Sequence, residues 1–123
     1  MEPVKDFKQL RVWKQAMELV GEVYGHTRLF PKEELYGLSN QLRRAAVSIP
    51  SNIAEGFKRY HLAEKRQFMN IAAGSAGELE TQLILACQLG FIPDHVVGEL
   101  LEKLNHVSRM ISSLINRIED KTK

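Results

Sequence analysis

The stretch QLRRAAVSIPSNIAEGFKR, residues 41–59, decides the fold because it continues a helical pattern across a proline. Pro50 removes a backbone donor and costs a helix interior ~3 kcal/mol. Ile53 nevertheless follows in phase with the apolar residues before the proline. Those residues recur at spacings of four, three and four, the period of one buried helical face, and they are Leu38, Leu42, Ala45 and Ile49.

Two interpretations of this stretch remain open. The favoured one is a single long helix with a kink at Pro50, because proline is a usual cause of sharp bends. The alternative is a true break, in which Asn52 caps a short second helix and Glu55 completes an N-x-x-E capping box. In both, Gly56 is the first clear helix terminator after the proline.

The chain length predicts a single domain over residues 1–123, since a chain of this size can bury a hydrophobic core without disulfides or other covalent cross-links. One cysteine, Cys87, cannot form an internal disulfide, which favours a reducing compartment. There is no signal-peptide pattern at the start and no apolar run long enough to span a bilayer. We therefore expect a cytoplasmic protein with no membrane association.

Charge is unevenly distributed along the chain. The formal net charge is only +2, but the segment from Arg43 to Arg66 holds a clear excess of basic groups over its two acidic ones, Glu55 and Glu64. Such an asymmetry can create a local positive patch on a nearly neutral protein.

A first helix is expected from the N-cap Asp6, with Gln9 three residues on, to the segment before Pro31. This helix is apolar on two stripes, so it is expected to bury more than one side, either in a crowded core or against another subunit. One stripe is Leu10, Trp13, Met17, Val20, Tyr24 and Thr27, and the other is Val12, Ala16, Leu19 and Val23.

Three further helices are expected over about 32–57, about 62–89 with Gly90 as its C′ residue, and from Pro93 to a frayed tail at 121–123. Residues 72–77, AAGSAG, are unusually small for a helix centre, which predicts close approach of another backbone. No strand-like alternation occurs. Four long helices with short links predict an all-α, antiparallel up-and-down four-helix bundle.

These residues resemble a known family of small four-helix-bundle proteins. The family includes proteins encoded in intervening sequences of bacterial 23S ribosomal RNA genes, together with the accessory variability protein of diversity-generating retroelements. His61 departs from the pattern, because members usually carry Ser or Thr there to cap the third helix. The resemblance covers nearly the whole chain and is strongest at Val12-Trp13 to Ala16, at residues 36–38, 41–45 and 48–56, and at residues 74–75 and 78–83.

The resemblance implies a bundle that assembles as a ring-like homopentamer. It also implies a role near nucleic acid, since the retroelement member is similar to a basic scaffold that works with a reverse transcriptase and its RNA. For the intervening-sequence members the family offers no established biochemical activity. The resemblance thus indicates a fold more firmly than a function.

The basic segment is the candidate nucleic-acid interface, with cations to neutralise phosphates and Tyr60 beside His61 for stacking on unpaired bases. The alternative is a solvated helix face with local pairs such as Glu55–Arg59. We expect a non-enzymatic, homo-oligomeric protein that binds RNA or DNA, or else a protein–protein scaffold without nucleic-acid contact. The candidate residues are Arg43, Arg44, Lys58, Arg59, Tyr60, Lys65 and Arg66.

A second set of polar residues lies on or beside the seams of the second and third helices. It reads as a buried structural network that fixes register rather than as a catalytic carboxylate pair. Its members are Asn52, Glu55, Ser75, Glu78 and Gln82.

Metal and cofactor chemistry have little support in the sequence. The pairs Glu22/His26 and Glu102/His106 each share a helix face, but the Glu-x-x-His motif of di-iron bundles is missing. Cys87 is expected to be a buried structural thiol without a neighbouring base. No catalytic residue, metal site or cofactor is therefore expected.

Overall fold

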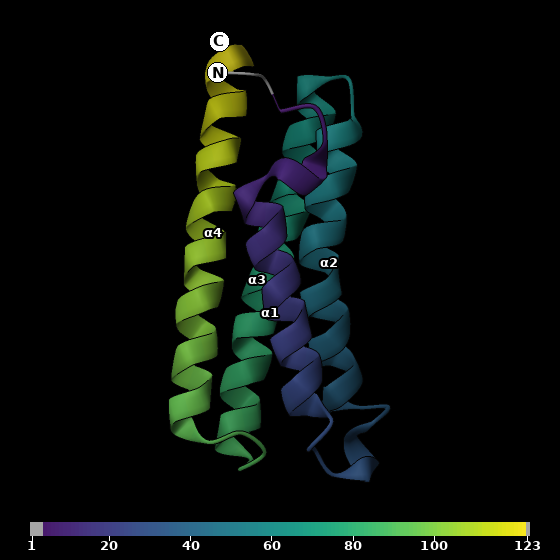
Figure 1. The fold of residues 1–123 in the computed structure, drawn as a ribbon, viewed down its shortest axis with the longest axis vertical. Helices are drawn as coiled ribbons and strands as arrows, with labels where there is room; N and C mark the ends of the chain where they lie inside the picture. The colour runs from purple at the N-terminus through teal and green to yellow at the C-terminus, as the bar shows by residue number, and fades with distance from the viewer. Residues whose placement is uncertain (1–3, 123) are drawn as a thin grey trace.

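Four long helices stand side by side in the computed structural model, which describes residues 4–122 (Figure 1). Each helix runs antiparallel to the one before it, and no strand occurs in the described chain, so the predicted up-and-down four-helix bundle is confirmed. Two short 3-10 helices, η1 and η2, precede α1 and α2. The elements are η1 Phe7–Gln9, α1 Arg11–Thr27, η2 Lys32–Glu34, α2 Leu38–Lys58, α3 Leu62–Gln88 and α4 Asp94–Thr122.

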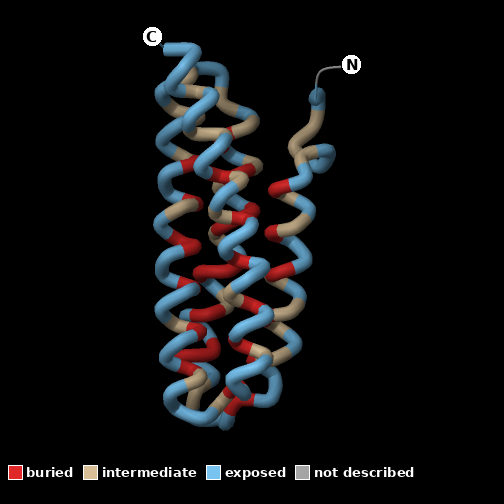
Figure 2. Tube along the Cα trace, turned by 90° about the vertical axis from the view of Figure 1, so that its left-hand side faces the viewer, coloured by how far each residue is buried: buried red, intermediate tan, exposed pale blue. Residues whose placement is uncertain are grey.

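One hydrophobic core runs the length of the bundle. Buried positions lie where the helices face one another, and exposed positions lie outside (Figure 2). The pairing of α2 with α3 is the most extensive and that of α1 with α4 the least. The largest side chains of the core come from all four helices, and they include Leu19, Leu42, Ile49, Ile53, Leu79, Leu83, Leu100, Leu104 and Ile111.

The start of the chain differs from the prediction of a helix beginning at Asp6. The expected capping box forms: Lys8 N donates to the Asp6 carboxylate at 2.9 Å, and the Gln9 side chain accepts from the Asp6 N–H. The helix that it caps, however, is only the short η1. Leu10 is extended (φ −73°, ψ 128°), which separates η1 from α1. The ring of Phe7 then lies 5.4 Å from that of Trp13 in an edge-on contact.

Only one of the two apolar stripes of α1 faces the core fully. Its members Val12, Ala16, Leu19 and Val23 are all buried. From the other stripe Thr27 is buried, whereas Met17 is 44% exposed and Trp13 and Val20 are half-buried against the core. The bundle therefore leaves an apolar strip along the outer side of α1.

The second helix begins later than predicted. Residues 32–34 form η2, and α2 starts only at Leu38, because the Glu34 carboxylate accepts from Leu38 N at 3.2 Å and so caps the new helix. Leu35, within the range expected to be helical, lies in this connection and is 46% exposed.

From Leu38 the helix α2 continues through Pro50 to Lys58, so the prediction of a single long helix is confirmed and the alternative of a break at Asn52 is wrong. The kink expected at Pro50 stays a prediction. Asn52 lies inside the helix, where its Nδ2 donates to the Ser48 carbonyl at 2.7 Å. The helix ends at Lys58, one residue past the expected end at about 57, with Gly56 inside its last turn.

The close backbone approach occurs at Gly56 rather than in the middle of α3. A Cβ atom on Gly56 would lie 2.9 Å from Met69 Cε, 3.0 Å from Phe68 Cβ and 3.3 Å from the Lys65 carbonyl oxygen. Gly74, at the centre of the predicted small-residue stretch, would place its Cβ in open space. The prediction of close approach is therefore wrong for Gly74 within this chain.

The link from α3 to α4 follows the predicted glycine stop. Gly90 has φ +79°, its N–H donates to the Cys87 carbonyl at 3.0 Å, and the Phe91 N–H donates to the Ala86 carbonyl at 2.9 Å. These two bonds form a Schellman motif, which satisfies the last carbonyls of α3. Within residues 4–122 none of the helices combines the length and apolarity needed to span a bilayer.

Replacing Gly56 by alanine should lower the free energy of unfolding by about 1–2 kcal/mol, because the overlap with α3 outweighs the gain in helix propensity. The matched control is Gly74→Ala, which meets no neighbour and should raise stability by up to ~1 kcal/mol. Urea denaturation measures both changes. Equal stabilisation by the two alanines would contradict the close approach at Gly56.

Candidate nucleic-acid interface

The seven candidate residues divide into two groups instead of forming one patch. Residues 58–60, 65 and 66 surround the link between α2 and α3 at one end of the bundle. Arg43 and Arg44 lie lower on α2, and the 15 residues from Arg44 to Arg59 correspond to about 22 Å of helix.

The α2–α3 link lies at the same end of the bundle as η1 and the C-terminal part of α4 (Figure 1). Lys58 Nζ stands 5.6 Å from the ring centre of Phe7, next to η1. Burial lowers the pKa of Lys65, and the positive charge of Lys121 on α4 lowers it further. Several positive charges are therefore crowded together here. We call this surface the basic end and define it by Lys58, Arg59, Tyr60, Lys65, Arg66 and Lys121.

Lys121 is the member of the basic end that the sequence reasoning missed. The available signal was the topology itself, because an up-and-down bundle returns the end of the fourth helix to the link between the second and third. The stretch 121–123 was expected only as a frayed tail, but α4 remains helical through Thr122, and residue 123 lies outside the described residues.

Members of the basic end differ in how free they are. Arg59 pairs with Glu55 and lies over the Phe68 ring at 4.8 Å, while Lys65 Nζ donates to the Phe57 carbonyl at 2.8 Å. Lys58 and Arg66 are exposed and have no ion-pair partner among the described residues.

Tyr60 is 90% exposed, and its ring lies edge-on to His61 at 5.2 Å. His61 occupies the N-cap position of α3 without a side-chain capping bond. The first N–H groups of α3 therefore add the partial positive charge of a helix N-terminus to the basic end.

Arg43 is committed to the interior of the bundle. Its Nε donates to Thr27 Oγ1 at 2.8 Å, and its guanidinium lies 4.9 Å from the ring centre of Tyr24. Thr27 Oγ1 in turn donates to the Val23 carbonyl at 2.8 Å. Arg43 thus ties α1 to α2, whereas its neighbour Arg44 points to solvent with no partner among residues 4–122.

The polar set on the α2–α3 seam is only partly joined. Ser48 Oγ and Ser75 Oγ share a hydrogen bond of 2.7 Å, and Asn52 Nδ2 reaches Ser48 Oγ at 2.9 Å. Sequence reasoning named Asn52 and Ser75 but omitted Ser48, which links them. Glu55 turns outward to Arg59.

The two remaining members of the polar set have no partner. Glu78 is exposed without one, and Gln82 Oε1 is buried with no donor in the described chain. Glu55 and Glu78 do not form a carboxylate pair, since Glu55 is bound to Arg59.

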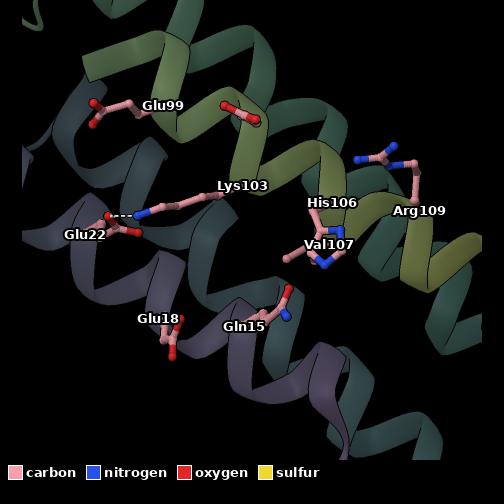
Figure 3. Close-up of a pocket in the computed structure, with 9 residues that line it drawn as sticks. Gln15, Glu18, Glu22, Glu99, Lys103, His106, Val107 and Arg109 are labelled. Carbon is pink, nitrogen blue, oxygen red and sulfur yellow. Dashed lines mark hydrogen bonds and ion pairs between the residues drawn. The ribbon is translucent and has the colours of Figure 1, made fainter. Parts of the chain in front are cut away.

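A groove of about 650 Å³ lies between α1 and α4 (Figure 3), and from the two Glu/His pairs its lining includes Glu22, Glu102 and His106 but not His26. Glu22 is bound across the groove to Lys103, and this hydrogen bond raises the pKa of Lys103, with further attraction from Glu99 and Glu18. Within residues 4–122 no three His, Cys, Asp or Glu side chains come together in a group that could hold a metal ion.

Cys87 is half-buried near the C-terminal end of α3 rather than fully enclosed as expected. Its Sγ donates to Asp94 Oδ1 at 2.8 Å, and this bond raises the pKa of the thiol, with burial adding to the effect. A raised thiol pKa disfavours the thiolate form that a nucleophile needs.

These features define a small helical-bundle protein with one basic end. The sequence matches the family described as 23S rRNA-intervening sequence protein over residues 8–113. The chain therefore belongs to that family.

A crystal structure of a protein with unknown function, from the S23 ribosomal protein family of Bacteroides thetaiotaomicron, has the same fold. It is 22% identical, with a TM-score of 0.79, and the match covers 85% of this chain and 97% of that one. A search of curated proteins finds no match.

Replacing Asn52 by alanine should lower the free energy of unfolding by about 1 kcal/mol, because both hydrogen bonds to Ser48 are lost. The control is Asn70→Ala on the exposed side of α3, which should change stability by less than about 0.5 kcal/mol. Thermal and urea unfolding of the two variants provide the test. Identical melting curves would mean that the two hydrogen bonds from Asn52 to Ser48 contribute nothing to stability.

Proposed function

We propose that this protein is a homo-oligomeric, non-catalytic accessory factor that binds RNA or DNA through the basic end. The observation that carries the proposal is the gathering of cations from α2, α3 and α4 at the end of the bundle where the exposed Tyr60 lies. Lys121 lowers the pKa of Lys65, so the two charges repel each other in the free protein. A bound polyanion would relieve that repulsion.

The expected mode of binding is phosphate neutralisation with little base readout at this surface. Lys58 and Arg66 are exposed and available to phosphates, and Tyr60 offers a stacking face worth about 1–3 kcal/mol per base. Binding of this kind weakens steeply with salt, because each neutralised phosphate releases counterions.

Assembly would compensate for the small net charge of a single chain. A net charge of +2 is low for a dedicated nucleic-acid-binding domain. The homopentamer implied by the family resemblance would repeat the basic end around a ring, and several weak sites on one nucleic acid act together.

An apolar groove between α1 and α2 supports the assembly part of the proposal. It is lined by the outer stripe of α1, with Trp13, Met17 and Val20, and by Val47 and Pro50 of α2. Met17 and Val47 are 44% and 39% exposed. A continuous apolar strip on an otherwise charged surface marks an interaction face.

The same groove favours a second candidate function. A protein–protein scaffold, with no direct nucleic-acid contact, would use this face for a protein partner such as a polymerase acting on RNA. The two candidates differ in which surface is essential, the basic end or the apolar groove.

Charge reversal of the two cations without ion-pair partners, in Lys58→Glu/Arg66→Glu, should weaken binding to single-stranded RNA. It should also reduce the magnitude of the slope of log affinity against log salt concentration by at least about 1.4, because each lost phosphate contact accounts for ~0.7. Fluorescence anisotropy at several salt concentrations measures both quantities. The matched control is Arg28→Glu/Lys32→Glu, which makes the same charge change on exposed residues of the α1–α2 connection at the opposite end of the bundle. Equal effects of the two double variants would rule out the basic end as the site.

Introducing charge in Met17→Glu/Val47→Glu should reduce the assembly to single chains, because two carboxylates would be desolvated at the apolar groove. Light scattering measures the mass, and circular dichroism checks that the helices persist. Leu29→Glu is the control, since Leu29 is 81% exposed and outside the groove. An unchanged mass in the double variant would show that subunits meet elsewhere or not at all.

A further inference from the structure

A polar hollow, separate from the basic end, opens on the side of the α2–α3 pair, about 22 Å away along α2. Its volume is about 520 Å³, large enough for one nucleotide. Tyr36 stands at its edge, in the connection before α2. Arg44 comes from α2, and Glu78 and Gln82 come from α3. We call this hollow the Arg44 pocket.

The lining of the Arg44 pocket divides into bound and free groups. Ser48 and Ser75 are joined by their 2.7 Å hydrogen bond and form a fixed part of the wall. Arg44 and Glu78 make no hydrogen bond, ion pair or ring contact among residues 4–122, although both line the same hollow. A free guanidinium and a free carboxylate in one pocket remain available to a ligand.

Gln82 adds an independent sign of a missing partner. Its Oε1 is the one buried side-chain oxygen or nitrogen in the described chain that has no hydrogen-bond partner. Buried polar atoms in proteins are nearly always paired, so this oxygen calls for an N–H donor that the chain does not supply. The free Glu78 carboxylate is an acceptor in the pocket, and Gln82 lies beside it in the lining, where a rotation of its side chain would turn this enclosed oxygen toward a ligand.

We propose that the Arg44 pocket binds an unpaired guanine nucleotide. This inference rests on the proposed nucleic-acid binding, but it assigns a surface other than the basic end and adds a preference for one base. Guanine presents two adjacent donors, N1–H and the N2 amino group, and a carboxylate such as that of Glu78 accepts from both at once. Once its side chain turns toward the pocket, Gln82 Oε1 accepts from the remaining amino hydrogen. Uracil has a single N–H between two carbonyls, which would face these acceptors unfavourably.

The rest of the nucleotide finds matching groups at the rim. The Arg44 guanidinium suits a phosphate, with which it forms paired hydrogen bonds. Tyr36 is 91% exposed, so its ring is free to stack on the base, as aromatic side chains do with splayed-out bases of single strands. A second hollow across Arg44, lined by Tyr24 and Arg43, leaves room for the neighbouring nucleotide.

Titration calorimetry with four probes tests the assignment: guanosine 5′-monophosphate, uridine 5′-monophosphate, an all-uridine hexanucleotide and the same hexanucleotide with one guanosine. The wild-type protein should prefer the guanine member of a pair by about tenfold or more, the discrimination of one bidentate contact. Glu78→Gln should abolish this preference without weakening the all-uridine strand. Arg44→Gln should weaken both members of a pair alike.

Glu80→Gln is the control, because Glu80 is exposed on α3 outside the pocket and its loss should leave the preference intact. A preference seen with the free monophosphates supports a nucleotide site, and one seen only within the strands supports a subsite for RNA.

No guanine preference in either pair, or one that survives Glu78→Gln, would overturn the assignment. The assignment would also be overturned if Glu78→Gln changed the oligomer mass and left the base preference unaltered. That result would mark the pocket as a face between copies of this chain. Failure of the proposed function appears differently, as an all-uridine strand that does not bind at low salt.

Discussion

The structure depends on α2 remaining helical across Pro50 while it packs against α3. The proline costs ~3 kcal/mol in a helix interior. Ile49 and Ile53, on either side of it, are 1% and 0% exposed, and burying two such side chains contributes roughly 3–6 kcal/mol. Asn52 reinforces the same turn through its bond to the Ser48 carbonyl. Apolar burial therefore exceeds the local cost, and the helix continues.

A continuous α2 also sets the spacing of the two candidate binding surfaces. Its 21 residues span about 31 Å, with the Arg44 pocket near the start and the basic end at the finish. A break at Pro50 would have released Gly56 from its contact with Phe68 and Met69. The α2–α3 link, and with it the cluster of Lys58, Arg59 and Lys65, would then have lost its fixed position against α4.

Periodic features of the sequence predicted the fold well, because burial repeats with the helix. The seam through Leu42 and Ile49 and the stop at Gly90 follow from spacing and backbone preference alone. The start of α2 does not, since the Glu34 carboxylate that caps Leu38 belongs to a turn that only the packed structure defines. The site was less predictable than the fold, because the positions of charged residues in the sequence do not reveal which of them form hydrogen bonds or ion pairs in the folded chain. Arg43 and Arg44 are adjacent in sequence, yet only Arg43 is bound to Thr27.

Aromatic rings hold most of the cations in the candidate interface. Such contacts contribute only about 0.5–1 kcal/mol each at exposed sites, so their role in stability is modest. Their effect on binding can be larger, because a lysine or arginine already ordered on a ring loses less side-chain entropy when it meets a phosphate. A guanidinium stacked on a ring also keeps its N–H edge free for that contact. Arg44 and Arg66 have no such support and would be ordered only by the ligand. Arg43 is supported by Tyr24 outside the basic end. Within the basic end the supported cations are Lys58 on Phe7, Arg59 on Phe68 and Lys65 on Phe57, so this surface is largely ordered before anything binds.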